Sequence, residues 1–274
     1  MTNINIRFTA IGDCGVDRYV SYNKDVPGGT ALNSAVYAKR SGAEASIISA
    51  IGTDTHSDIP LSCLKSEEVN TSQLSQTSGK TNIVDITLSP EGNPEYGTWD
   101  LGVLESFRLN KSHEVFLNTQ HIVTAVHLPE LRHMFDGLAY MELPDVLKVA
   151  DFTDLSEYNG DINVIETYLD LFDVVCLSID ASDKDRLAEY YELLEQKGKL
   201  GIAMMGENGS AVYHKGNLTY QQAHKVKVVD TTGAGDSYLA TFLVTYFQTK
   251  DIYSSMEKAT KVASKVIQSI GAIT

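Results

Sequence analysis

The chain has 274 residues, of which 43% are hydrophobic and 21% are charged, so it is long enough to bury one large core. Its net charge of −14, without any basic stripe, argues against binding to nucleic acids or to an anionic membrane. No apolar run reaches the roughly 18 residues of a membrane span, and neither a signal peptide nor paired cysteines occur, so we expect a cytoplasmic protein.

The first half of the sequence alternates between strand and helix patterns. Residues 7–12 are a short apolar run that predicts a buried strand, and Asp13 follows it at the position where α/β proteins keep their ligands. Pro27-Gly28-Gly29 interrupts the chain before Thr30, which is typical of a helix N-terminus. The elements expected in this half are strands at 7–12, 16–26, 46–51, 81–88 and 96–101, and helices at 30–42 and 57–68.

The second half continues the alternation and ends in two helices. Parallel strands covered by helices are the arrangement that such alternation favours. The sequence therefore predicts an α/β fold, with the segments 16–26 and 81–103 forming a small separate sheet. The elements expected after residue 120 are strands near 121–126, 147–152, 174–179, 201–205, 210–214 and 218–220, and helices near 130–140, 162–170, 184–197, 235–244 and 254–269.

The most informative stretch is Asp230-Thr-Thr-Gly-Ala-Gly-Asp236, which lies directly before an apolar helix. Because that helix is apolar on nearly every side, its N-terminus should point into the protein. The glycines let several N–H groups converge on one point, where the helix dipole adds positive potential, so the stretch predicts a phosphate site. Asp236 would lie beside it as a base for a hydroxyl proton, which suits phosphoryl transfer to an alcohol. The alternative is a glycine-containing turn capped by Asp236.

The remaining motifs each have a structural alternative. Asp13 and Asp17 could bind hydroxyl groups or could cap local turns, and Gly28-Gly29 could admit a ligand or only shape the start of a helix. Residues 206–209 (Gly-Glu-Asn-Gly) lie between two apolar runs, which by itself predicts a type I′ hairpin turn. Residues 78–81 (Ser-Gly-Lys-Thr) look like part of a P-loop, but the first glycine is missing and a strand pattern follows, so we reject that interpretation.

The chain resembles the ribokinase-like (PfkB-type) carbohydrate kinases along essentially its whole length. The motif at 230–236, the pair Gly28-Gly29 with Asn33 behind it, and Gly12-Asp13 carry the resemblance. It implies one domain over residues 1–274: a three-layer α/β sandwich with a central, mostly parallel sheet, plus a β-sheet lid formed by segments 14–27 and 81–103. It also implies an ATP-dependent kinase that uses Mg²⁺ and dimerises through its lid.

The resemblance also implies a role for individual residues. Asp236 would be the catalytic base, with the backbone of Gly233, Ala234 and Gly235 as the anion hole. The resemblance also implies three sets of binding residues: Asp13, Asp17, Gly28, Gly29 and Asn33 for the sugar; Gly206, Glu207, Asn208, Gly209 and Thr231 for the nucleotide; and Asp230 and Thr232 for a monovalent cation such as K⁺.

Two segments depart from the family's usual pattern. The Asn-x-x-Glu segment that helps to place magnesium is replaced by residues 178–185, where Asp183 is our candidate ligand, and the common Asp-x-Asn reads Asp151-Phe-Thr-Asp154. Both departures, together with residues 12–24, are similar to the fructosamine (fructoselysine) kinases of bacteria. That similarity implies phosphorylation of a primary hydroxyl of a sugar-amine conjugate, best represented by fructoselysine.

Several interpretations stay open at this point. The substrate could instead be ribose, fructose, ketodeoxygluconate or a nucleoside, and a catalytically silent sugar sensor would keep the same fold. If the substrate carries an amino acid, Asp17 or Asp25 could bind its ammonium group and Arg18 or Lys24 its carboxylate. A dimer would be favoured by apolar side chains on the lid strands, namely Tyr19, Val20, Tyr22, Trp99 and Leu101.

Overall fold

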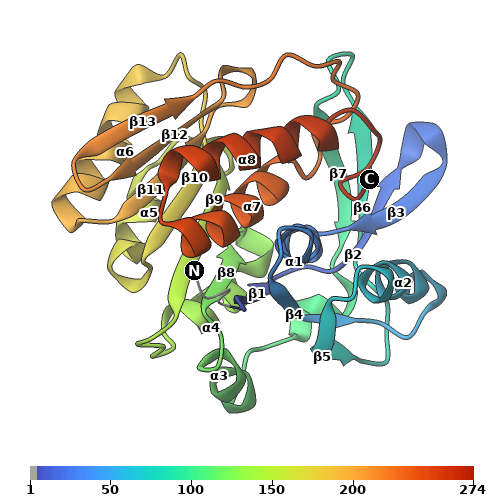
Figure 1. Cartoon of the computed structure of the whole chain (residues 1–274). Coiled ribbons are helices and arrows are strands. Elements are labelled where there is room, and N and C mark those ends of the chain that lie inside the picture. Colours follow the sequence, from blue (N-terminus) through green and yellow to red (C-terminus); the bar gives the residue numbers. More distant parts are fainter. Residues whose placement is uncertain (1–4) are drawn as a thin grey trace.

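Strands followed by helices bring successive strands into parallel register, because a parallel pair needs a long crossover connection. In the computed structural model, which describes residues 5–274, nine strands form one sheet that is parallel except at β12, which pairs antiparallel with β11 and β13 (Figure 1). The mostly parallel sheet expected from the sequence is confirmed. Its strand order is β13 (Asn217–Gln221), β12 (Ser210–His214), β11 (Leu200–Met204), β10 (Val174–Ser178), β9 (Leu147–Asp154), β8 (Ile122–Val126), β1 (Arg7–Ile11), β4 (Glu44–Ile51) and β5 (Asn70–Gln76).

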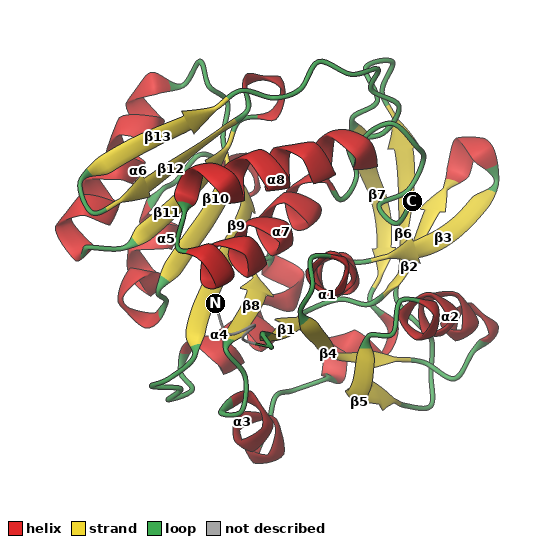
Figure 2. Ribbon diagram, viewed as in Figure 1, coloured by secondary structure: helices red, strands yellow, loops and turns green. Residues whose placement is uncertain are grey.

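Helices cover both faces of this sheet, which completes a three-layer sandwich. One core cluster joins the sheet to α1 (Thr30–Arg40), α7 (Ala234–Thr249) and α8 (Ile252–Val266), with α2 (Asp58–Ser66) beside them. The other cluster contains α4 (Arg132–Ala139), α5 (Asn163–Tyr168) and α6 (Lys184–Lys197), and α3 (Lys111–Leu117) adds Leu117 to it. Figure 2 shows α7 and α8 crossing the same face of the sheet.

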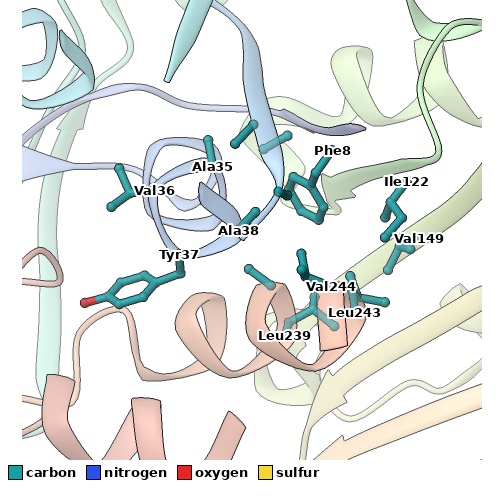
Figure 3. Packing of buried hydrophobic residues seen from close by; sticks show 14 of the residues in the cluster. Phe8, Ala35, Val36, Tyr37, Ala38, Ile122, Val149, Leu239, Leu243 and Val244 are labelled. Atoms are coloured by element: carbon teal, nitrogen blue, oxygen red, sulfur yellow. The ribbon is translucent and has the colours of Figure 1, made fainter. Parts of the chain in front are cut away.

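The packing around α7 explains why its N-terminus is buried. Figure 3 shows α1 and α7 meeting over Phe8 of β1, with Ile122 and Val149 contributed by neighbouring strands. Small side chains on α1 let the two helices approach closely, and α7 is apolar on nearly all sides. Burying these side chains stabilises α7 in one orientation, so the position of Asp236 in its first turn is fixed by the core.

Among the residues described, four strands form the smaller sheet, in the order β3 (Lys24–Gly28), β2 (Gly15–Tyr19), β6 (Ile83–Leu88) and β7 (Pro94–Asp100). Asp17 pairs with Val84 and Tyr19 with Ile86, while Val84 and Ile86 pair in turn with Trp99 and Tyr96 across a β-bulge in β7. Directly paired residues share a face of a sheet. These six side chains therefore form one face, which we call the inner face of the lid because Tyr19 hydrogen-bonds to Asp230 of the main body.

The structure contains elements that the sequence pattern does not predict. Strand β5 and helix α3 are both rich in polar residues and short, so neither shows a clear hydrophobic period. The predicted strand at 16–26 is instead two strands joined by a 3₁₀ turn at Val20–Tyr22. The strand β6 follows residues 78–81, so the rejection of a P-loop is confirmed. Cys14, Cys63 and Cys176 are free and buried, and no helix over residues 5–274 is long and apolar enough to cross a membrane.

Candidate active site

The predicted anion site lies at the N-terminus of α7. Gly233 precedes the helix with a φ of 74°, a left-handed conformation that glycine adopts without strain. The N–H of Ala234 donates to the Thr231 carbonyl at 3.1 Å. Within residues 5–274, the N–H groups of Gly233, Gly235 and Asp236 have no protein acceptor. These three groups are therefore free to bind an anion, and the N–H of Ala234, expected from the sequence to take part, is already bonded.

Asp236 is buried in the first turn of α7, beside those free N–H groups. Asn33 Nδ2 donates to Asp236 Oδ2 at 2.8 Å, and the Oδ1 atom of Asn33 is buried without a partner. Burial raises the pKa of Asp236 to about 8; the hydrogen bond from Asn33 opposes this shift, and the negative charges of Asp151 and Asp13 add to it. A carboxyl group with this pKa is well suited to accept a proton near neutral pH.

Asp13 lies opposite Asp236 at the end of β1, and one of its two carboxylate oxygens is occupied. Its Oδ1 accepts from the backbone N–H of Thr30 at 3.0 Å and from the Thr30 hydroxyl at 2.7 Å, so it caps α1 as the structural alternative predicts. Its Oδ2 accepts no hydrogen bond within residues 5–274 and is free for a ligand hydroxyl. Gly29 makes this approach possible, because a Cβ there would lie 2.6 Å from the Asp13 carbonyl oxygen.

Asp17 extends from β2 on the inner face of the lid and is buried without a hydrogen-bond donor in the part of the chain described. Burial raises its pKa well above the usual range, and the charges of Asp13, Asp236 and Asp230 raise it further. Gly28 packs directly against it, since a Cβ on Gly28 would lie 1.9 Å from Asp17 Oδ1. The carboxyl oxygens of Asp17 therefore keep their hydrogen-bonding capacity for a ligand hydroxyl.

Asp151 is a further buried carboxyl group that the sequence analysis noted only as part of a motif. It ends the regular part of β9, and with Asp236 it lines a small cavity between β1, α1 and β8. Burial raises its pKa to about 6 and the N–H of Thr153, at 2.9 Å, opposes the shift. Thr153 has a φ of 51°, which is strained for a β-branched residue. The signal in the sequence was an acid at the carboxyl end of a buried strand, as for Asp13.

The nucleotide loop expected from the sequence lies beside the anion site. A Cβ added to Gly235 would lie 3.2 Å from the Cε of Met204, which is the last residue of β11. The loop at 206–209 therefore begins next to the N-terminus of α7. That loop is a 3₁₀ turn in which Asn208 does not have a positive φ. The type I′ turn is therefore wrong, because it requires positive φ at both central residues.

The other residues expected to bind the nucleotide or a metal are engaged in protein contacts. Thr231 donates its N–H to the carbonyl of Gly92 and its hydroxyl to Asn93, both in the turn between β6 and β7. Asp183 is exposed and caps α6 by accepting the N–H of Arg186. Within residues 5–274, no group of three or more His, Cys, Asp or Glu residues is arranged to hold a metal ion.

Two of the charged residues expected to bind an amino-acid group, Arg18 and Asp25, do not face the site. Arg18 follows Asp17 in β2, so it points to the opposite face of the lid. There it forms an ion pair with Asp25, with an N–O distance of 3.0 Å, and contacts His56. The expectation that Arg18 and Asp25 bind the substrate is therefore wrong, because the two side chains satisfy each other on the outer face.

Tyr96 is a residue of the lid's inner face that the sequence analysis missed. It lies on the inner face of the lid and is 63% exposed, yet protein surrounds it closely enough to raise the pKa of its phenol. The charges of Asp17, Asp236, Asp230 and Asp13 raise that pKa further, as expected for a phenol on the same side of the lid as these carboxyl groups. A bulge shifts the register of β7, so simple alternation along 96–101 could not assign its face.

The geometry combines free N–H donors at the start of α7 with three buried carboxyl groups, those of Asp236, Asp13 and Asp17. Comparison with known proteins agrees. The model of the pfkB family carbohydrate kinases matches residues 3–274. The chain is 28% identical to fructoselysine 6-kinase of Shigella flexneri, covering 96% of this chain and 97% of that protein, and 26% identical to fructosamine kinase FrlD of Bacillus subtilis, covering 97% and 93%.

A solved structure shows the same architecture. The structure of Arabidopsis thaliana ribokinase complexed with ribose and ATP aligns with a TM-score of 0.79 at 17% identity, covering 98% of this chain and 95% of that one. The fold is thus the ribokinase-like sandwich with its smaller sheet, as the sequence predicts. The match over residues 3–274 shows that the chain belongs to the pfkB family of carbohydrate kinases.

Proposed function

We propose that this carbohydrate kinase transfers the γ-phosphoryl group of ATP, in the cytoplasm and with Mg²⁺, to a primary hydroxyl of a fructosamine such as fructoselysine. The observation that carries the phosphoryl transfer is the position of Asp236, buried beside three free N–H groups and close enough to Asp13 and Asp17 for their charges to interact. The similarity to fructoselysine and fructosamine kinases supports the substrate.

Each group has a distinct part in the proposed reaction. Asp13 and Asp17 accept hydrogen bonds from sugar hydroxyls, which orients the substrate. Asp236 Oδ1, which Asn33 leaves free, takes the proton of the attacking hydroxyl. The N–H groups of Gly233, Gly235 and Asp236 hold the transferred phosphoryl group as negative charge develops on its oxygens. The loop at 206–209 lies where the rest of the nucleotide would extend.

The residues present suit a magnesium ion that is held mainly by nucleotide phosphates. Mg²⁺ keeps several waters and takes few protein ligands, which agrees with the lack of a preformed cage in the part of the chain described. When bound, it would neutralise charge on the phosphates. Asp183 stays the candidate from the sequence, and Asp151 is the unassigned carboxyl group that shares a cavity with Asp236.

We expect fructoselysine to be phosphorylated with a higher kcat/KM than free fructose or ribose. The inner face of the lid carries Asp17, which could pair with the substrate's ammonium group, and the exposed ring of Tyr96, which could contact its apolar part. Free fructose and ribose lack the aminoacyl part that would reach such groups. ADP release, coupled to a detecting enzyme, would be measured for fructoselysine, other fructosamines, fructose, ribose, ketodeoxygluconate and nucleosides.

The outcomes of this screen separate the candidate functions. Turnover of ribose, fructose or a nucleoside at least about tenfold more efficient than that of fructoselysine would refute the fructosamine assignment and leave the kinase assignment intact. Sugar binding without ADP release from any substrate would favour the silent sensor. Tyr96→Phe and Tyr96→Ala, compared on fructose and fructoselysine, would show whether the lid ring contributes to the preference.

The pH profile should report the raised pKa of Asp236. A base must be deprotonated to act, so we expect kcat/KM to rise with pH and to level off above about pH 8. Asp151→Asn removes a negative charge that disfavours ionisation of Asp236, so it should move the midpoint of the profile to lower pH. A profile that stays flat between pH 6 and pH 9, or a midpoint unmoved in Asp151→Asn, would contradict this electrostatic coupling.

Dimerisation through the lid stays a prediction, with a smaller surface than the sequence suggested. Tyr19 is fully buried, and Trp99 and Leu101 are partly buried against the core, so these three offer less surface to a partner than the sequence suggested. Val20 and Tyr22 are 53% and 54% exposed, and the edge strands β3 and β7 each leave their outer edge unpaired among the described strands. Paired lids would cover these edges. Light scattering at micromolar concentration that gave the mass of one 30.0 kDa chain would exclude a stable dimer.

A further inference from the structure

The carboxylate of Asp230, at the start of the anion-site loop, has a hydrogen-bond donor for each of its lone pairs. Its Oδ1 accepts from the N–H of Thr232 at 2.9 Å and from the Thr232 hydroxyl at 2.6 Å. Its Oδ2 accepts from the Tyr19 hydroxyl at 2.5 Å and from the N–H of Gly271 at 2.8 Å. A carboxylate offers about four lone-pair directions, so Asp230 is saturated by the protein itself.

This saturation does not suit the monovalent cation that the sequence suggested for Asp230 and Thr232. A cation binds through oxygen lone pairs, and the four of Asp230 are occupied, while the Thr232 hydroxyl directs its proton to Asp230. Asp230 is also completely buried. A cation could bind Asp230 only by displacing one of these donors and by leaving that donor unsatisfied inside the protein.

Tyr19 is the one donor of the four that comes from the lid. It is the last residue of β2 and is itself fully buried on the inner face. Burial and the bond to Asp230 raise the pKa of its phenol, so the hydroxyl keeps its proton and donates it. The contact joins the lid to the loop that leads directly to Gly233. Thr231 makes a second contact between the same loop and the lid, through Gly92 and Asn93.

We propose that the Tyr19 hydroxyl takes the place of a monovalent cation at Asp230, so that the lid itself holds the anion-site loop and activity does not depend on K⁺. A bound cation and a hydrogen bond from a lid tyrosine can each offset the free-energy cost of burying the Asp230 carboxylate beside a phosphate site. With the tyrosine, the Asp230 loop is ordered only when β2 lies over it. Tyr19 is thus a positioning residue and does not contact the reacting atoms.

The first test varies the cation of the added salt and uses the wild-type protein. Unfolding temperature without substrate, and the initial rate of phosphorylation, would be measured in KCl, NaCl and tetramethylammonium chloride at one fixed ionic strength. We expect both to be the same in the three salts, because a ligand that does not bind the native state cannot stabilise it. A rise in unfolding temperature specific to K⁺, or a rate at least about tenfold higher in K⁺, would overturn the proposal. The rate measurement rests on the proposed function, whereas the unfolding temperature does not.

The second test removes the hydroxyl. Tyr19→Phe leaves Asp230 Oδ2 with one donor, so we expect kcat/KM to fall roughly 10- to 100-fold and the unfolding temperature to drop. Because the freed lone pair is a cation ligand, K⁺ but not tetramethylammonium should restore part of both quantities. Tyr253→Phe, which removes the hydroxyl of a tyrosine that is exposed on α8, is the matched control and should resemble wild type in every salt.

The results of the second test are decisive in either direction. A Tyr19→Phe protein that matches wild type would show that the hydroxyl does not hold Asp230. A Tyr19→Phe protein that is weakened equally in all salts would show a role in packing alone. Either result overturns the replacement of a cation by Tyr19. If the variant does not fold, the salt series on the wild-type protein still decides the matter.

Discussion

Asp236→Asn is expected to lower kcat by roughly 10²–10⁴, the usual size of a general-base contribution, while ATP still binds. The amide is nearly the same size as the carboxyl group, so it can keep the contact with Asn33 after a flip of its own amide or that of Asn33. It cannot accept the proton of the attacking hydroxyl. The free N–H groups of Gly233 and Gly235 are unchanged, so nucleotide binding should persist.

The measurements are steady-state kinetics and calorimetric titration with ATP. Asp251→Asn is the matched control, since Asp251 caps the neighbouring helix α8 by accepting from Tyr253 and Ser254 and is exposed. This control should cost about 1 kcal/mol of stability at most and leave kcat unchanged. Activity of Asp236→Asn within about threefold of wild type would remove Asp236 from the role of base.

The sequence could predict those parts of the site that depend on residues close together in one short stretch. Residues 230–236 join a glycine turn, an acid and an apolar helix, and each feature has a local physical consequence. The apolar character of α7 predicts its burial, and burial predicts that its N-terminus points inward, as the structure shows. Asp13 could be found in the same way, because the end of a buried parallel strand lies at the ligand edge of the sheet.

The parts that could not be predicted depend on contacts between distant segments. Tyr19 was expected on a surface because it lies in a lid strand, but its partner Asp230 is 211 residues away. Tyr96 was missed because a β-bulge determines which face it occupies. The ion pair between Arg18 and Asp25 follows from the register of two strands, and composition alone could not show that the charges were already satisfied.

Gly233→Ala is expected to lower kcat/KM by roughly 10²–10³, the range for losing anion-hole donors. A Cβ on Gly233 would lie 2.3 Å from the Cβ of Ala272, which is much closer than atoms approach. Ala272 cannot move aside easily, because its carbonyl accepts a hydrogen bond of 2.7 Å from Tyr37 and the N–H of Gly271 binds Asp230. The loop that carries the free N–H groups must therefore shift.

Gly198→Ala separates this clash from the cost of a left-handed alanine. Gly198 ends α6 with a φ of 64°, and a Cβ added to it would meet no other atom within 4 Å, so its substitution should cost roughly 1–2 kcal/mol of stability and no activity. Gly233 has a similar φ but also the clash with Ala272, so we expect Gly233→Ala to lose more stability than Gly198→Ala and to be the variant that loses kcat/KM. Equal activity of the two variants would mean that the anion site does not depend on the position of Gly233, and the free N–H groups at the start of α7 would then not be the phosphate site.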